Sequence, residues 1–181
     1  MVSAGDIERV SMESVADRAG VSRALVYKHF ANRGELLSAV YERESAHLHA
    51  SMAAKVEQAG TLEDMLRALV EGALAAQASR GATFAALAAS GSRPPQQRSI
   101  QRRRDAQTLR FFTRRAVAEL GLDEPVARTA LDVTLSTIPV VLSQWRQRAT
   151  AAHAADLADI YVSMTIGGLK ALSRPRLTKP T

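Results

Sequence analysis

The stretch Ser11–Phe30, SMESVADRAGVSRALVYKHF, carries the strongest structural signals in the chain. A serine, which can cap a helix N-terminus, precedes each of two short amphipathic runs at 12–19 and 23–30. Between them, Gly20 can take the left-handed conformation that ends a helix. The spacing predicts two short helices joined by a three-residue turn, which is the spacing of a helix-turn-helix motif.

The rest of the chain favours an all-α fold. It has 33 alanines among 181 residues, with 10 glycines, 6 prolines and 4% aromatic residues, a composition that suits helices better than sheets. Caps, glycines and apolar periodicity predict further helices at roughly 32–56, 62–81, 83–89, 96–120, 124–147 and 153–174. Pro139 should kink the fifth of these, and a fixed structural bend is favoured over a bend that transmits ligand binding.

Composition excludes several classes of function. The chain has no cysteine, so disulfides, thiolate metal sites and cysteine nucleophiles are excluded, and an intracellular, cytoplasmic location is expected. Met1–Met12 contains no apolar signal-peptide core, and apolar stretches such as Phe84–Ala89 are too short to span a membrane. The net charge of +6 permits an anionic partner without requiring one.

The region Gly5–Tyr41 resembles the DNA-binding domain of the tetracycline-repressor (TetR) family. The matching features are the turn Ala19–Ser22, the sequence Tyr27-x-His29-Phe30, and a basic residue at 33 before two leucines. The resemblance implies a transcriptional regulator, in the first instance a repressor, that binds a double-stranded DNA operator. It also implies a division into a DNA-binding domain at 1–44, a ligand-binding and dimerisation domain at 45–174, and a tail at 175–181.

The spacing of residues in the second short helix supports that interpretation independently. Val26 and Phe30 are expected to face the core, while Arg23, Ala24, Tyr27 and Lys28 form a contiguous outward face. Arg23 and Lys28 can donate to guanine, and Ala24 can contact a thymine methyl group. Tyr27, His29 and Arg33 suit phosphates. The predicted DNA-binding residues are Ser11, Ser22, Arg23, Ala24, Tyr27, Lys28, His29 and Arg33.

A second hypothesis follows from the N-terminus. In the family a further helix precedes the motif, whereas about ten residues precede Ser11, so we expect this first helix to be missing. Met1–Gly34 carries five basic and four acidic residues, which leaves little net charge to attract DNA. The alternative function is therefore a dimeric helical ligand-binding or interaction module that binds DNA weakly.

The C-terminal part is expected to form a homodimer through its last two helices, as the family resemblance implies. Gly167 and Gly168 interrupt an apolar helix and would allow close helix approach, although the pair can also simply weaken the helix. The resemblance further implies a small-molecule effector, and an apolar cavity would suit a hydrophobic or amphipathic one. Candidate pocket residues, for each of which plain core is the favoured interpretation, are Met65, Leu69, Phe84, Leu87, Leu109, Phe112, Trp145 and Tyr161.

The segment Arg93–Arg115 is strongly basic, with eight arginines against Asp105. It can be a second nucleic-acid surface or an anionic-partner site, but a solvated helix face is the favoured interpretation.

Enzymatic activity has little support in the sequence. His47 and His49 lie at i, i+2 and point to different helix faces, so they make a poor metal pair. Hydrolase, phosphate-loop and dinucleotide-binding motifs do not occur. We expect no cofactor, no metal and no catalytic residue, and a helical enzyme without a recognisable motif is the least favoured alternative.

Overall fold

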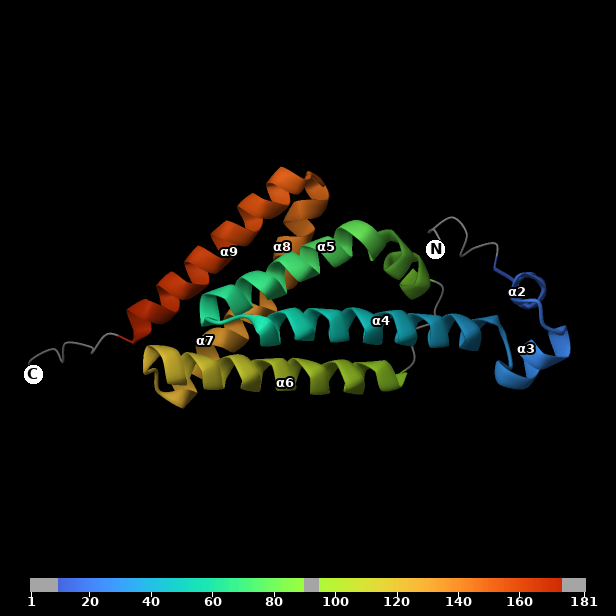
Figure 1. The fold of residues 1–181 in the computed structure, drawn as a ribbon, viewed down its shortest axis with the longest axis horizontal. Coiled ribbons are helices and arrows are strands. Elements are labelled where there is room, and N and C mark those ends of the chain that lie inside the picture. Colours follow the sequence, from blue (N-terminus) through green and yellow to red (C-terminus); the bar gives the residue numbers. More distant parts are fainter. Residues whose placement is uncertain (1–9, 90–94, 174–181) are drawn as a thin grey trace, which may run out of the picture. The chain divides into compact units, whose positions relative to one another are not determined.

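The computed structural model describes residues 10–89 and 95–173, and the side chains of this part except those at 82–89, 95–98 and 101. This part is helical throughout and contains no strand, which confirms the all-α prediction. The expectation about a helix before Ser11 lies outside the described residues. The helices (Figure 1) are α2 (Met12–Ala19), α3 (Arg23–His29), α4 (Arg33–Gln58), α5 (Leu62–Ala89), α6 (Pro95–Leu120), α7 (Glu124–Ser136), α8 (Ile138–Gln147) and α9 (Ala151–Leu172).

The chain forms two compact units. One contains residues 1–50 and 76–100, and the other contains residues 51–75 and 101–181. The long helices α4 and α5 therefore contribute residues to both units. The predicted domain boundary after residue 44 stays a prediction.

The first unit has a small core of its own. Its buried residues are Met12 and Ala16 of α2, Val26 of α3, and Leu36 and Leu37 of α4. Burying these apolar side chains orients α2 and α3 against the start of α4, because two helices this short bury too little surface to be stable alone.

The second unit contains the larger core. Its largest fully buried side chains come from four helices, so α5, α6, α7 and α9 pack around a common centre. Phe112 of α6 is only 1% exposed and meets the neighbouring Phe111 ring edge to face. These side chains are Phe112, Leu62, Leu66, Leu131, Leu169, Val70 and Val162.

The helix end predicted near Gly81 was wrong. Residues 62–89 form one continuous helix, whereas a stop near Gly81 was expected. A glycine in a helix interior costs about 1 kcal/mol relative to alanine, which does not end a helix that other contacts stabilise. The loop expected at 91–95 lies largely outside the described residues, and α6 begins at Pro95, a favoured first helical position.

The helix predicted at 124–147 is two helices rather than one kinked helix. α7 ends at Ser136, Thr137 caps it, and α8 begins at Ile138 with Pro139 in its first turn. Proline has no backbone N–H to donate to the residue four positions earlier, so the helix restarts here. The Tyr161 hydroxyl of α9 donates to the Thr134 carbonyl oxygen (3.3 Å) at this break.

In the described part, one stretch, Glu124–Gln147, is long and apolar enough to cross a membrane by length and composition alone. It comprises α7 and α8, which are separate helices. Ala127 and Leu131 are buried in the core, and Val141 and Leu142 pack against it. Most of the stretch is not buried, but a single stretch that passes this test is weak evidence for a membrane span.

Candidate nucleic-acid interface

The first helix of the motif, α2, is capped as the sequence predicts. The Ser11 hydroxyl accepts from the Ser14 backbone N–H (3.1 Å), and the Ser14 hydroxyl accepts from the Ser11 N–H (2.9 Å). This reciprocal pair is a capping box with serine at its third position instead of the usual glutamate or glutamine. Gly20 ends the helix at φ +67°, in the left-handed region. The turn geometry is therefore fixed by local residues.

The second helix, α3, presents the face expected from its spacing. Ser22 caps it and accepts from the Leu25 N–H (3.2 Å). Val26 is 6% exposed and belongs to the core of the first unit, while Phe30 is partly buried against it. The exposed side chains of the helix include the five predicted to meet DNA, which are Arg23, Ala24, Tyr27, Lys28 and His29.

Tyr27 has a partner that the sequence does not indicate. Its hydroxyl lies 3.4 Å from Oε1 of Glu13, in the first turn of α2. The pKa of the Glu13 carboxyl is held below its usual value, first by the residue's own backbone N–H and then by the Ser11 hydroxyl, with smaller contributions from Arg23 and Tyr27. Glu13 is therefore an ionised group beside three of the residues predicted to bind DNA.

Arg33 and Glu35 stabilise the start of α4. Arg33 Nε donates to the Val10 carbonyl oxygen (2.7 Å), which ties α4 to the residue before the N-cap of α2. The Asn32 side chain caps the helix by accepting from the Glu35 N–H (2.9 Å). The Glu35 carboxylate accepts from the Ala31 N–H (2.7 Å), one residue before the backbone partner of an ordinary capping box. The phosphate contact predicted for Arg33 stays a prediction.

The predicted pocket residues fall into three groups according to their burial. Met65, Phe112 and Tyr161 are buried in the core of the second unit. Leu69, Leu109 and Trp145 are partly buried against that core. The side chains of Phe84 and Leu87 lie outside the described part. The structure thus brings six of the eight predicted residues into one apolar cluster, and their role in ligand binding stays a prediction.

Two of these residues make polar contacts as well. Burial raises the pKa of Tyr161 to about 12, so this phenol stays protonated and donates to Thr134. The Trp145 indole N–H donates to the Thr150 carbonyl oxygen (3.2 Å). Both are amphipathic side chains whose polar atoms are satisfied within the protein.

The second unit also has an open cavity of about 280 Å³. Met65 of the predicted pocket lines it, together with apolar side chains and charged ones at its edge. The lining residues are Val56, Glu57, Ala59, Met65, Phe111, Arg114, Arg115 and Ala118.

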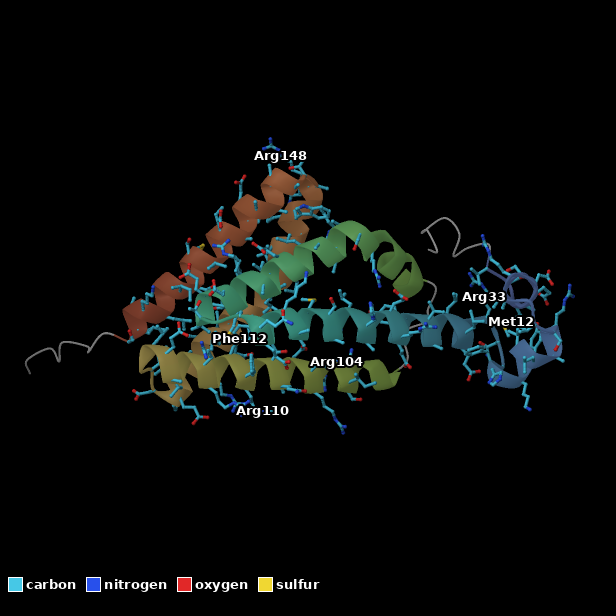
Figure 2. All side chains as sticks on the ribbon, in the orientation of Figure 1. Met12, Arg33, Arg104, Arg110, Phe112 and Arg148 are labelled. Carbon is cyan, nitrogen blue, oxygen red and sulfur yellow. The ribbon has the colours of Figure 1, made fainter. Side chains whose placement is uncertain are left out.

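The basic segment forms an exposed stripe on α6. Arg103, Arg110 and Arg114 are exposed and lie at i, i+7 and i+11, so they share one face of the helix. Figure 2 shows Arg110 projecting away from the α6 ribbon. Arg115, by contrast, pairs with Glu119 (3.1 Å). This arrangement fits the solvated face favoured by the sequence.

In the part of the chain that the structure describes, no group of three or more metal-ligating side chains comes together. Sequence reasoning predicted the exposed face of α3 but did not predict the contact between Glu13 and Tyr27. The place of Glu13 in a first turn indicated only stabilisation of the helix N-terminus, and no local signal connects it with Tyr27, 14 residues later.

Comparison with known proteins agrees with this description. Residues 2–40 match the family model of bacterial regulatory proteins, tetR family. No curated protein sequence matches the chain. Among solved structures, the chain is similar to the fatty acid degradation regulator FadR from Bacillus halodurans, with a TM-score of 0.60 and 17% identity over 92% of this chain and 93% of that chain. At that identity the likeness shows a shared fold.

The all-helical fold and the exposed second helix of the N-terminal motif define a DNA-binding transcriptional regulator of the helix-turn-helix class. Its N-terminal part, residues 2–40, matches the model of the tetR family of bacterial regulatory proteins. The resemblance seen in residues 5–41 is thereby confirmed.

Proposed function

We propose that the protein is a ligand-responsive repressor that binds a palindromic operator as a homodimer in the cytoplasm and has no enzymatic activity. The observation that carries this proposal is the division of α3 into two faces. Val26 anchors the helix in the core, while Arg23, Ala24, Tyr27 and Lys28 stay exposed. A recognition helix needs this division, since one face enters the major groove and the other packs on its own domain.

The chemistry of the exposed face suits both parts of operator recognition. Arg23 and Lys28 can donate to guanine O6 and N7, and Ala24 is small enough to approach a thymine methyl group. Tyr27 and His29 can donate to phosphates, which fix the register of the helix on the duplex without reading sequence. Ser11 and Ser22, at the two helix N-termini, are placed among phosphate donors in the same proposal.

Homodimerisation is supported by an apolar surface on the last two helices. Val140 of α8 is 58% exposed, and Ile160 and Met164 of α9 are 55% and 73% exposed. Gly167 and Gly168 continue the same face of α9, and a Cβ atom built on either meets nothing within 4 Å. An exposed apolar stripe beside small residues suits close packing against a second copy. A two-fold dimer would match a palindromic operator.

The proposed effector is a hydrophobic or amphipathic small molecule. The support is the apolar core of the second unit, where six of the predicted pocket residues cluster. A structural neighbour is a regulator of fatty acid degradation, which fits an effector with an apolar body. Release of the operator requires the effector to bind the DNA-free state more tightly than the DNA-bound state.

The test is DNA binding by the purified chain to the intergenic region upstream of its own gene. Binding is measured across a salt series with excess unrelated duplex, because phosphate contacts alone give salt-dependent, sequence-independent affinity. We expect a specific complex of two chains per operator. A folded dimer that shows no preference for any sequence would contradict the proposal and favour the ligand-binding module.

A further inference from the structure

An acidic side chain lies within the proposed DNA-binding face. Glu13 stands in the first turn of α2, and its Oε1 is 3.4 Å from the Tyr27 hydroxyl of α3. Both side chains belong to the first unit. A carboxylate here is unexpected, because a surface that meets phosphates is normally depleted of negative charge.

The neighbours of Glu13 are the groups expected to serve DNA. Besides Tyr27, the Ser11 hydroxyl and the Arg23 guanidinium favour its ionised form, and the carboxyl pKa is lowered accordingly. In the DNA-free protein, the carboxylate therefore faces one predicted base-reading residue and two predicted phosphate donors. A phosphate that approaches Tyr27 must replace this carboxylate as hydrogen-bond acceptor and meets its negative charge.

Building on the proposed function, we propose that Glu13 is a positioning residue that competes with DNA phosphate for the Tyr27 hydroxyl. It keeps the Tyr27 side chain in place while no DNA is bound, and it lowers the affinity of the helix-turn-helix motif for DNA of any sequence. The proposed competition with phosphate is independent of base sequence, so the operator and unrelated DNA are affected alike.

A purely structural role predicts something different. Glu13 also stabilises the helix N-terminus, where acidic residues interact favourably with the helix dipole. Loss of that stabilisation would leave DNA affinity unchanged or lower it through a less stable α2. Competition with phosphate instead predicts that removing the charge raises affinity.

The experiment compares Glu13→Gln with Asp17→Asn in the full-length chain. Asp17 is an exposed acid on the same helix, so its variant makes the same change in net charge away from Tyr27. We expect Glu13→Gln to bind the operator and an unrelated duplex about two- to fivefold more tightly, the range for one exposed charge interaction. Asp17→Asn should bind as the native chain does. Thermal melting checks that both variants are folded.

A double-mutant cycle with Tyr27→Phe tests whether Glu13 acts through the hydroxyl. The gain from Glu13→Gln should shrink when the Tyr27 hydroxyl is absent. Independently of DNA, the carboxyl pKa of Glu13, measured by NMR titration, should rise in Tyr27→Phe and in Arg23→Ala.

Three results would overturn the inference. Unchanged affinity in Glu13→Gln would remove the competition, and an equal gain in Asp17→Asn would assign the effect to net charge. Weaker binding of Glu13→Gln to the operator alone would mean that the carboxylate reads a base, such as the amino group of cytosine. Each of these leaves specific binding by the native chain intact, whereas failure of the native chain to bind DNA refutes the proposed function as well.

Discussion

Replacing Met164 by alanine tests the proposed dimer surface directly. Met164 lies on the exposed face of α9, and 73% of it is accessible in the single chain. Complete burial of a methionine side chain is worth about 1.5–3 kcal/mol. If a partner covers the exposed fraction, each protomer loses roughly 1–2 kcal/mol of that stabilisation in the variant.

The symmetry of the dimer doubles this effect. In a two-fold interface the same substitution occurs on both sides, so Met164→Ala should cost about 2–4 kcal/mol of dimer stability. That corresponds to a dissociation constant raised roughly 30- to 1000-fold. The fold of the single chain should be little affected, because a side chain this exposed contributes little to its core.

Sedimentation velocity over a range of protein concentrations measures the dimer dissociation constant. Val40→Ala is the matched control, because Val40 is also an exposed apolar residue but lies on α4. We expect the control to dimerise as the native chain does. A Met164→Ala variant with the native dissociation constant would refute the assignment of this face to the dimer interface, and a native chain that stays monomeric would refute dimerisation itself.

Three further predictions concern the helix-turn-helix motif and the core of the second unit. Arg23→Ala should weaken operator binding by about 1–3 kcal/mol and relax base preference at one position, whereas Tyr27→Phe should weaken binding to all duplexes alike. Competition assays with operator and random DNA measure both effects, and native-like binding by both variants would contradict the prediction. Tyr161→Phe should lower the free energy of unfolding by about 1 kcal/mol, because it removes the donor to the Thr134 carbonyl. In the native chain, absorbance should show one tyrosine that titrates near pH 12 and that is absent from the variant. A Tyr161 phenol that titrates at its ordinary pH in the native chain would refute the burial argument. The pKa of Glu13 is lowered in the folded chain, first by its own backbone N–H, so the stabilisation from its carboxylate is present above the unfolded-state pKa and is lost as the pH falls through the folded-state pKa. Acid unfolding of Glu13→Gln that follows the native curve would contradict this prediction.

Much of the helical organisation is readable from the sequence because its signals are local. A serine before an apolar run and a glycine after it act on backbone groups within four residues. Gly20 and Gly121 both take the positive φ that their positions required, +67° and +64°. The burial of Val26 while Arg23 and Tyr27 stay exposed likewise follows from helical periodicity.

The same local reasoning failed where tertiary packing outweighed a weak signal. Gly81 lies inside α5 without ending it, because the helix gains more from its contacts than one glycine costs. Pro139 separates two helices, whereas a kink within one helix was predicted. It lies in the first turn of a new helix, because it has no backbone N–H with which to continue the preceding one.

The sequence by itself determined the helices, the helix-turn-helix motif and the exposed face of α3, since each depends on neighbours within a turn or two of the chain. Only the tertiary structure decided which long-range partners those residues meet. Glu13 reaches Tyr27 across 14 residues, and Arg33 reaches the Val10 carbonyl across 23. Such contacts depend on how one helix is oriented against another, which the burial of a few apolar side chains in the first unit decides. No spacing in the sequence encodes that orientation.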